Sequence, residues 1–182
     1  MEHNPNCLFF IVGDGDFDTY MKDCKDIWAN IVWTGLIDKT ILYELYTIAD
    51  IGIMPSFHEQ CSYVAIEMMM HGLPIIGSTS TGLYEMIENN VTGLHIPVIE
   101  HADRAEIDSS LLAEKILYLL QHPIEAKQMG QNGRRRYLNY YSSDIFRENM
   151  LKMYESCLHD KDNKIKVLIV TGQSNHNWEV SH

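Results

Sequence analysis

The sequence is short of positive charge, and it has no long apolar run. Its 182 residues include 14 lysines and arginines against 25 aspartates and glutamates, which gives a formal net charge of −11. This acidic balance argues against nucleic acid as a partner. No stretch approaches the roughly 18–20 apolar residues of a membrane-spanning helix, so we expect no integral membrane span. The polar first residues do not resemble a secretory signal peptide.

Cysteine is also scarce. The four cysteines, at positions 7, 24, 61 and 157, are scattered and form no C-x-x-C pair. Reduced thiols in a cytoplasmic protein fit this pattern best, and a full-length form could lie peripheral to the inner membrane. What the chain does have is a hydrophobic fraction of 46% and a charged fraction of 21%, as in soluble globular proteins. Its length suits one domain with a sizeable core.

Short apolar runs alternate with amphipathic stretches along the first hundred residues. Strands are predicted at residues 7–12, 31–34, 51–54, 73–77 and 91–96. Helices are predicted between them at 17–29, 42–48, 63–71 and 83–88, and then, after a polar loop at 98–108, at 111–121, 124–138 and 143–158. This alternation indicates an α/β fold: a Rossmann-like parallel sheet with helices on both faces. The continuous apolar run at 7–12 predicts a strand covered on both faces.

The segments that follow the predicted strands are rich in small and polar residues. They are residues 13–16, 35, 55–59, 78–82 and 97. In an open parallel sheet, ligands bind at the carboxyl ends of the strands. We therefore expect these segments to meet at one edge of the sheet and to form a binding site there.

Residues 55–67 carry the most unusual chemistry of the chain. Glu59 lies in the loop after a predicted strand, and Glu67 lies on the helix that follows. The start of that helix offers unpaired amides and a partial positive charge, which suit a phosphate, while a carboxylate can hold neighbouring hydroxyls. Glu67 is flanked by apolar residues, where an unpartnered carboxylate would cost about several kcal/mol. The stretch therefore predicts a site for a sugar nucleotide.

A diphosphate site normally includes a cation, and cations are few here. Lys22, Lys25 and Lys39 are the only basic residues among the first hundred positions. Either backbone amides bind most of the diphosphate, or the cation comes from outside this chain.

With these motifs in view, residues 6–158 resemble the C-terminal half of retaining glycosyltransferases of the family 4 type, which have the GT-B fold. The family pattern of Pro-Ser, Glu, seven residues and Glu is matched by residues 55–56, Glu59 and Glu67. Further matches in the family's order are residues 13–15, 33–35, 45–46, 49–50, Gly72, Pro74, 81–82, Glu85 and 92–93. Matches in this order are far more specific than a lone pair of glutamates.

The resemblance implies a donor site for a nucleotide sugar. It implies that Glu59 is the catalytic carboxylate, in contact with hydroxyls of the transferred sugar, and that Glu67 accepts the ribose hydroxyls. The implied donor-binding set also includes the backbone amides of Cys61, Ser62, Tyr63 and Val64, together with Gly13, Gly15, Thr34 and Gly35. Of these, Thr34 and Gly35 would lie near the base. Such enzymes retain the anomeric configuration and need no metal and no cofactor besides the donor.

The chain departs from the family pattern in three respects. Where the family has a triplet such as Pro-Phe-Gly after the first glutamate, this chain has Gln60, Cys61 and Ser62. The exchange of Gly for Ser62 keeps the amide but narrows the pocket, which affects sugar identity. The family's Arg and Lys for the diphosphate would lie just before Met1. The acceptor-binding N-terminal domain would also lie outside this chain.

The last residues differ in character from the rest. Residues 1–160 are predicted to form the donor-binding domain, and 161–182 a linker and the start of a second domain, although a terminal strand is an alternative. Residues 166–178 resemble the start of trehalose-utilisation-type domains, which have a glutamine-amidotransferase-like fold. Two other functions stay open for the main domain: half of a GT-B epimerase acting on sugar nucleotides, and a non-catalytic domain that binds nucleotide sugars.

Overall fold

The computed structural model describes residues 7–24 and 27–159. The chain divides into two compact units, Met1–Tyr141 and Ser142–His182. The first unit holds all the predicted strands up to residue 96 and all the predicted site residues. The predicted linker, strand and second domain at 161–182 lie outside the described residues.

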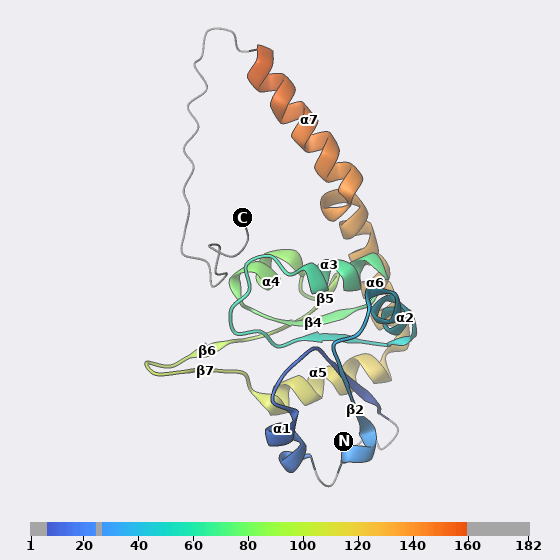
Figure 1. Ribbon diagram of the computed structural model, residues 1–182, viewed down its shortest axis with the longest axis vertical. Helices are drawn as coiled ribbons and strands as arrows, with labels where there is room; N and C mark the ends of the chain where they lie inside the picture. Colours follow the sequence, from blue (N-terminus) through green and yellow to red (C-terminus); the bar gives the residue numbers. More distant parts are fainter. Residues whose placement is uncertain (1–6, 25–26, 160–182) are drawn as a thin grey trace. The chain divides into compact units, whose positions relative to one another are not determined.

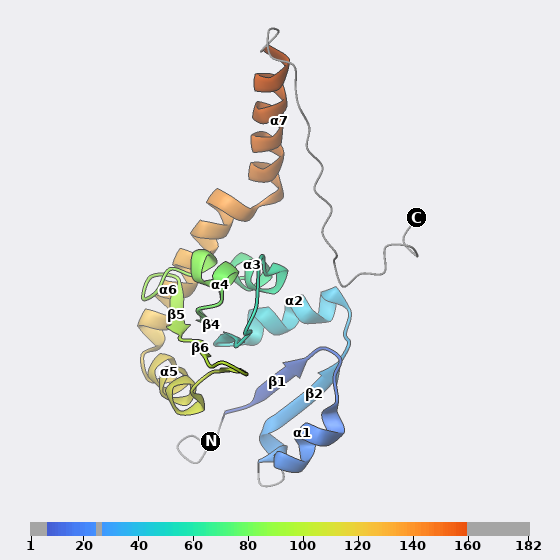
Figure 2. The same ribbon diagram turned by 90° about the vertical axis from the view of Figure 1, so that its left-hand side faces the viewer.

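The predicted strands are all present in the first unit, and each pairs in parallel with a neighbour (Figure 1). β1 (Phe9–Val12) pairs with β2 (Ile31–Gly35), and Figure 2 shows the two side by side. β4 (Ile75–Ser78) lies between β3 (Gly52–Met54) and β5 (Gly93–Ile96). The α/β class with parallel strands is therefore confirmed, but the strands form two separate ladders among the described residues.

The β1 strand departs from its predicted burial. Its continuous apolar sequence predicted coverage on both faces, yet Phe10, Ile11 and Val12 are 39%, 40% and 41% exposed. The reason is packing: neither of the two core clusters among the described residues includes a β1 side chain, so the strand is not covered on both faces.

Helices follow the strands as the periodicity predicts. They are α1 (Phe17–Asp23), α2 (Lys39–Ile48), α3 (Tyr63–Met70), α4 (Thr81–Met86), α5 (Ser109–Gln121) and α6 (Pro123–Arg136). α1 is shorter than predicted, and a 3-10 turn at Trp28–Asn30 precedes β2. α5 begins two residues earlier than predicted, because it is capped by Asp108, whose carboxylate accepts from the Ser110 and Leu111 amides. A π-helical turn, Tyr137–Tyr141, follows α6.

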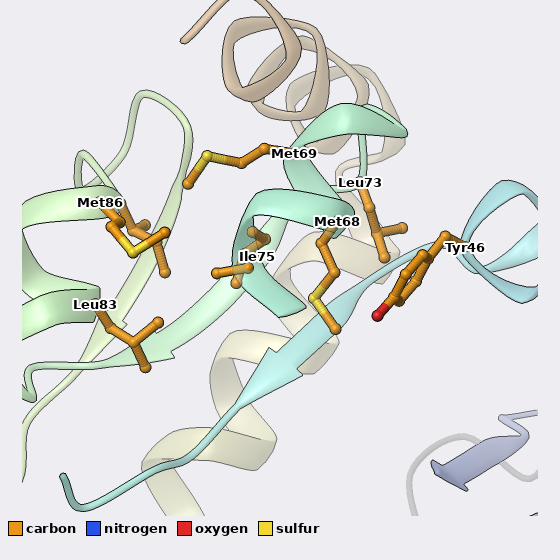
Figure 3. Close-up of a cluster of buried hydrophobic side chains, with 9 residues drawn as sticks. Tyr46, Met68, Met69, Leu73, Ile75, Leu83 and Met86 are labelled. Atoms are coloured by element: carbon orange, nitrogen blue, oxygen red, sulfur yellow. The ribbon is translucent and has the colours of Figure 1, made fainter. Parts of the chain in front are cut away.

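The core lies on both faces of the β3–β4–β5 ladder. Ile75 of β4 packs with α3 and α4 on one face, in a cluster with Met68, Met69 and Leu83 (Figure 3). The next residue, Ile76, points to the opposite face and packs against Leu119 of α5 and against α6. The predicted arrangement of helices on both faces thus holds for this ladder.

One predicted loop contains regular structure. Residues 98–108 include a small antiparallel hairpin of β6 (Ile99–Glu100) and β7 (Ala105–Glu106). A bond from the His101 amide to the Arg104 carbonyl closes its turn, at 2.8 Å. Glu106 lies within ion-pair distance of His101 and Arg104. Two-residue strands are too short to give a periodic signal, so the polar composition suggested a loop.

The second unit contains α7 (Ser143–His159), which matches the predicted last helix. None of the helices in the described part of the chain is long and apolar enough to cross a bilayer.

Candidate functional site

The loop after β3 is tied to the loop after β4 by hydrogen bonds. The Ser78 hydroxyl, fully buried at the end of β4, donates to the Ser56 carbonyl and lies 3.0 Å from the Ser80 hydroxyl. The third loop joins through Thr79, whose amide donates to the Ile96 carbonyl at 2.8 Å. The exits of β3, β4 and β5 therefore meet at one edge, as predicted for the carboxyl ends of parallel strands.

Gly82 fixes the backbone of Glu59. Its amide donates to the Glu59 carbonyl at 2.8 Å. A Cβ added to Gly82 would lie 2.1 Å from the Gln60 carbonyl oxygen and 2.7 Å from that of Glu59, so only glycine fits. The need for glycine in the Thr-Gly pair of the sequence motif is thus steric: without a side chain at Gly82, α4 begins in direct contact with the loop that carries Glu59.

The N-terminus of α3 is capped by Ser62. The Ser62 hydroxyl accepts from the Ala65 amide at 3.2 Å, and the residue is only 3% exposed. No acceptor from the described residues reaches the amides of Tyr63 and Val64, and both side chains face solvent together with that of Cys61. The side chain of Ser62 is therefore structural, while the free amides at the helix start can receive an anion.

Glu67 faces α2 and is held there by two side chains. Its carboxylate Oε1 lies 3.0 Å from the Lys39 ammonium and 3.4 Å from the Tyr43 hydroxyl. The Glu67 side chain is 14% exposed and that of Lys39 is 76% exposed. The burial cost that suggested a ligand for Glu67 is thus met, at least in part, by residues of the chain itself.

The charge of Glu67 influences its neighbours. A hydrogen bond from Lys39 to the Glu67 carboxylate, with the charge of that carboxylate, raises the pKa of the Lys39 ammonium. Burial, followed by the same negative charge, raises the pKa of Tyr46 to about 12. Tyr46 is 7% exposed and lies beside Met68 and Leu73 in the core (Figure 3). The Glu67 carboxylate, which lies between the Lys39 ammonium and the Tyr46 phenol, can accept hydrogen bonds from hydroxyl groups of a ligand.

The predicted residues of the first ladder form a separate group. The Gly13 amide donates to the Gly35 carbonyl at 3.1 Å, and both glycines have positive φ angles, 123° and 63°. The Thr34 hydroxyl lies 3.3 Å from the Ile11 carbonyl oxygen and 2.9 Å from that of Gly35. The Gly15 amide bonds to the Asp14 carboxylate at 2.9 Å. The hydroxyl of Thr34 therefore serves the β1–β2 connection.

The structure gathers the predicted site residues in two groups. Glu59, Ser62, the α3 amides and Glu67 share the β3–α3 segment, whereas Gly13, Gly15, Thr34 and Gly35 cluster at the end of the β1–β2 ladder. The described residues show no hydrogen bond or ion pair between the two groups. Within the part of the chain that the structure describes, no three His, Cys, Asp or Glu side chains gather so as to hold a metal ion.

Sequence reasoning missed two contributors. Lys39 and Tyr43 contact Glu67 from a helix 24 or more residues away in the chain, and no local spacing reveals that contact. The scarcity of basic residues in the first hundred positions was the one available signal for Lys39. Ser78 belongs to the predicted loop at 78–82, and its buried hydroxyl contacts the loop after β3 through the Ser56 carbonyl.

Comparison with known proteins places this geometry in a family. The family model described as glycosyl transferases group 1 matches residues 1–136. The capsular polysaccharide biosynthesis glycosyltransferase CapM of Staphylococcus aureus is 29% identical over 121 residues. That alignment covers 66% of this chain and 30% of the relative. Three other curated relatives are covered to 17–24% of their lengths.

Solved structures share the fold. Sucrose-phosphate synthase from Thermosynechococcus elongatus superposes with a TM-score of 0.71 at 25% identity, over 84% of this chain and 39% of that one. HepE from Anabaena, solved in complex with UDP, superposes with a TM-score of 0.69 at 17% identity, over 84% of this chain and 42% of that one. The chain thus spans about two fifths of each.

Proposed function

The chain belongs to the group 1 glycosyl transferases, and from that premise we propose that it is the nucleotide-sugar-binding half of a retaining GT-B enzyme of the family 4 type. The enzyme transfers a hexosyl group from a nucleoside-diphosphate sugar to a glycan or lipid-linked acceptor. The observation that carries the proposal is the Gly82 amide bound to the Glu59 carbonyl at 2.8 Å. This bond holds Glu59 directly before a helix with unoccupied amides.

The α3 N-terminus is the proposed seat of the diphosphate. The amides of Tyr63 and Val64 have no acceptor among the described residues, and the helix dipole adds a partial positive charge at this end. Backbone amides keep their direction without side-chain motion. They are therefore preorganised for the charge that grows on the leaving diphosphate in the transition state.

The two carboxylates are the proposed contacts for hydroxyls. Glu59 follows β3 in the loop and binds the transferred sugar, whereas Glu67 lies one helical turn into α3 and binds the ribose. Interactions that strengthen as the sugar becomes oxocarbenium-like would raise the rate, since catalysis depends on differential binding of the transition state. Gly13, Gly15, Thr34 and Gly35 are proposed to lie near the base and phosphates in the complete enzyme.

The relatives support a nucleotide-sugar donor and a polysaccharide product. HepE is described in complex with UDP, and CapM is described as a capsular polysaccharide biosynthesis enzyme. We propose that a longer protein supplies the acceptor site and the diphosphate cation from an N-terminal domain. In this scheme residues 1–160 form the donor-binding domain, and residues 161–182 begin a further domain of the trehalose-utilisation type.

Calorimetric titration of the 182-residue chain with UDP, GDP, ADP and the corresponding nucleotide sugars tests the proposal. We expect weak binding of one nucleoside diphosphate and no sugar transfer by this chain alone. A sample that is folded by circular dichroism and binds none of these compounds would refute the donor site.

A further inference from the structure

Lys39 is the first residue of α2, and its ammonium reaches across to α3. Its Nζ atom lies 3.0 Å from Oε1 of Glu67, on a side chain that is 14% exposed. Tyr43, one turn later on the same face of α2, places its hydroxyl 3.4 Å from the same oxygen. Two side chains of one helix therefore converge on a single oxygen atom of the proposed ribose-binding carboxylate.

We propose that Lys39 and Tyr43 are positioning residues for the nucleotide ribose: they anchor Glu67 through Oε1 and so direct Oε2 toward the ribose hydroxyls. This inference rests on the proposed function and adds α2 to the residues that determine donor affinity.

The geometry of the anchor supports this role. A carboxylate accepts hydrogen bonds at both oxygens, and both of these contacts are made to Oε1, while neither uses Oε2. Anchoring one oxygen removes the rotation of the carboxylate about its last bond. The two hydroxyls of a ribose then meet an acceptor that is already oriented, which lowers the ordering cost of binding.

The backbone of α3 adds a second constraint on Glu67. The Glu67 carbonyl lies 2.7 Å from Nδ1 of His71, and the His71 ring packs at 4.9 Å from that of Tyr43. A hollow of about 370 Å³ runs along this face of α2 and is lined by Lys39, Thr40, Tyr43, Glu44, Thr47 and His71. Lys39 and Tyr43 thus line an open hollow, while the Tyr43 ring also packs against the ring of His71.

Because Lys39 is exposed, a role in positioning Glu67 can be distinguished experimentally from a role in stabilising the fold. Its side chain is 76% exposed, and ion pairs with such exposure contribute little to stability. A Lys39→Met variant should therefore unfold at nearly the same denaturant concentration as the original chain. The variant should nevertheless bind a nucleoside diphosphate more weakly, because the Glu67 carboxylate is no longer held in place by Lys39.

The test measures binding of UDP and of 2′,3′-dideoxy-UDP by calorimetry to the full 182-residue chain and its variants. If the chain binds GDP or ADP instead of UDP, that nucleotide and its 2′,3′-dideoxy analogue are used. We expect Lys39→Met to weaken UDP about tenfold, as for loss of one charge-assisted hydrogen bond, and to change dideoxy-UDP affinity by less than about twofold. Lys39→Arg should restore most of the affinity, and Tyr43→Phe should cost about threefold.

The matched control is Lys127→Met, since Lys127 is an exposed lysine of α6 without a described contact to Glu67. It should bind UDP as the original chain does. Unchanged UDP affinity of Lys39→Met would overturn the inference, and so would equal losses for UDP and dideoxy-UDP. Absence of any nucleoside diphosphate binding by the original chain would instead overturn the proposed function, and this inference with it.

Discussion

Replacing Gly82 with alanine should separate recognition of the sugar from recognition of the nucleotide. A Cβ at this position would lie 2.1 Å from the Gln60 carbonyl oxygen, 2.5 Å from its carbon and 2.7 Å from the Glu59 carbonyl oxygen. Real Cβ contacts stay above 3.0 Å, so the loop must retreat by at least 3.0 − 2.1 = 0.9 Å. All three contacts would be made to backbone atoms, which cannot move aside as the end of a flexible side chain could.

The retreat has two expected costs. Overpacking of this kind lowers the free energy of unfolding by about 1–3 kcal/mol. A shift of about 1 Å in the loop should also remove the proposed hydrogen bond from the donor sugar to Glu59, worth about 1.5–3 kcal/mol or roughly 10–150-fold in affinity. The amides of Tyr63 and Val64 belong to α3, whose Ser62 cap and buried face are unchanged, so affinity for the bare diphosphate should fall much less.

The assay compares UDP and UDP-glucose binding to Gly82→Ala by calorimetry, with urea unfolding in parallel. Gly133→Ala is the matched control, because a Cβ there would lie 3.7 Å from the nearest atom, Cγ of Met69, in ordinary contact. That control should keep its stability and both affinities. If Gly82→Ala binds UDP-glucose as tightly as the original chain does, the contact between α4 and the Glu59 loop does not position the sugar site.

Two further predictions concern the carboxylates and the buried tyrosine. Glu67→Ala should weaken nucleoside diphosphate binding more than Glu59→Ala does in the same titration, because Glu59 is assigned to the sugar; the reverse order would mean that the two roles are exchanged. The pKa of Tyr46 is about 12 in the folded chain against an ordinary 10.0, so between these values the unfolded chain releases a proton that the folded chain keeps. The free energy of unfolding should therefore fall as pH rises from 10 to 12, by at most about 1.4 kcal/mol per pH unit. Urea unfolding at pH 9 and pH 11 should show a smaller fall for Tyr46→Phe, and equal falls would contradict the assignment.

The sequence was sufficient to predict elements whose signals are local. The strand before residue 55 and the helix after residue 62 follow from a short apolar run, a break at residues 55–56 and a second apolar stretch. The close approach of Gly82 to the Glu59 loop could be suspected from the Thr-Gly motif, but its cause is visible only as a contact between two loops. Met68 and Met69 are buried in the core, as the apolar character of their helix indicates.

The remaining features depend on distant contacts. Lys39 meets Glu67 only because α2 and α3 pack together, and neither residue carries a local sign of the other. The hairpin at 99–106 is held by one turn and an ion-pair cluster, and its strands are shorter than any period that a pattern could reveal. The division of the strands into two ladders likewise reflects which strands lie side by side, which hydrophobic periodicity does not encode.

The exposed edge of β1 has a practical consequence for handling this chain in solution. The strand shows β2 as its partner on one side, and its apolar side chains are about two fifths exposed on the described surface. An open edge of this kind offers unpaired amides and carbonyls in register, and any extended apolar segment can dock there, including that of another copy. Concentrated samples should therefore self-associate, and dilution heats in a titration will include the breakup of such assemblies.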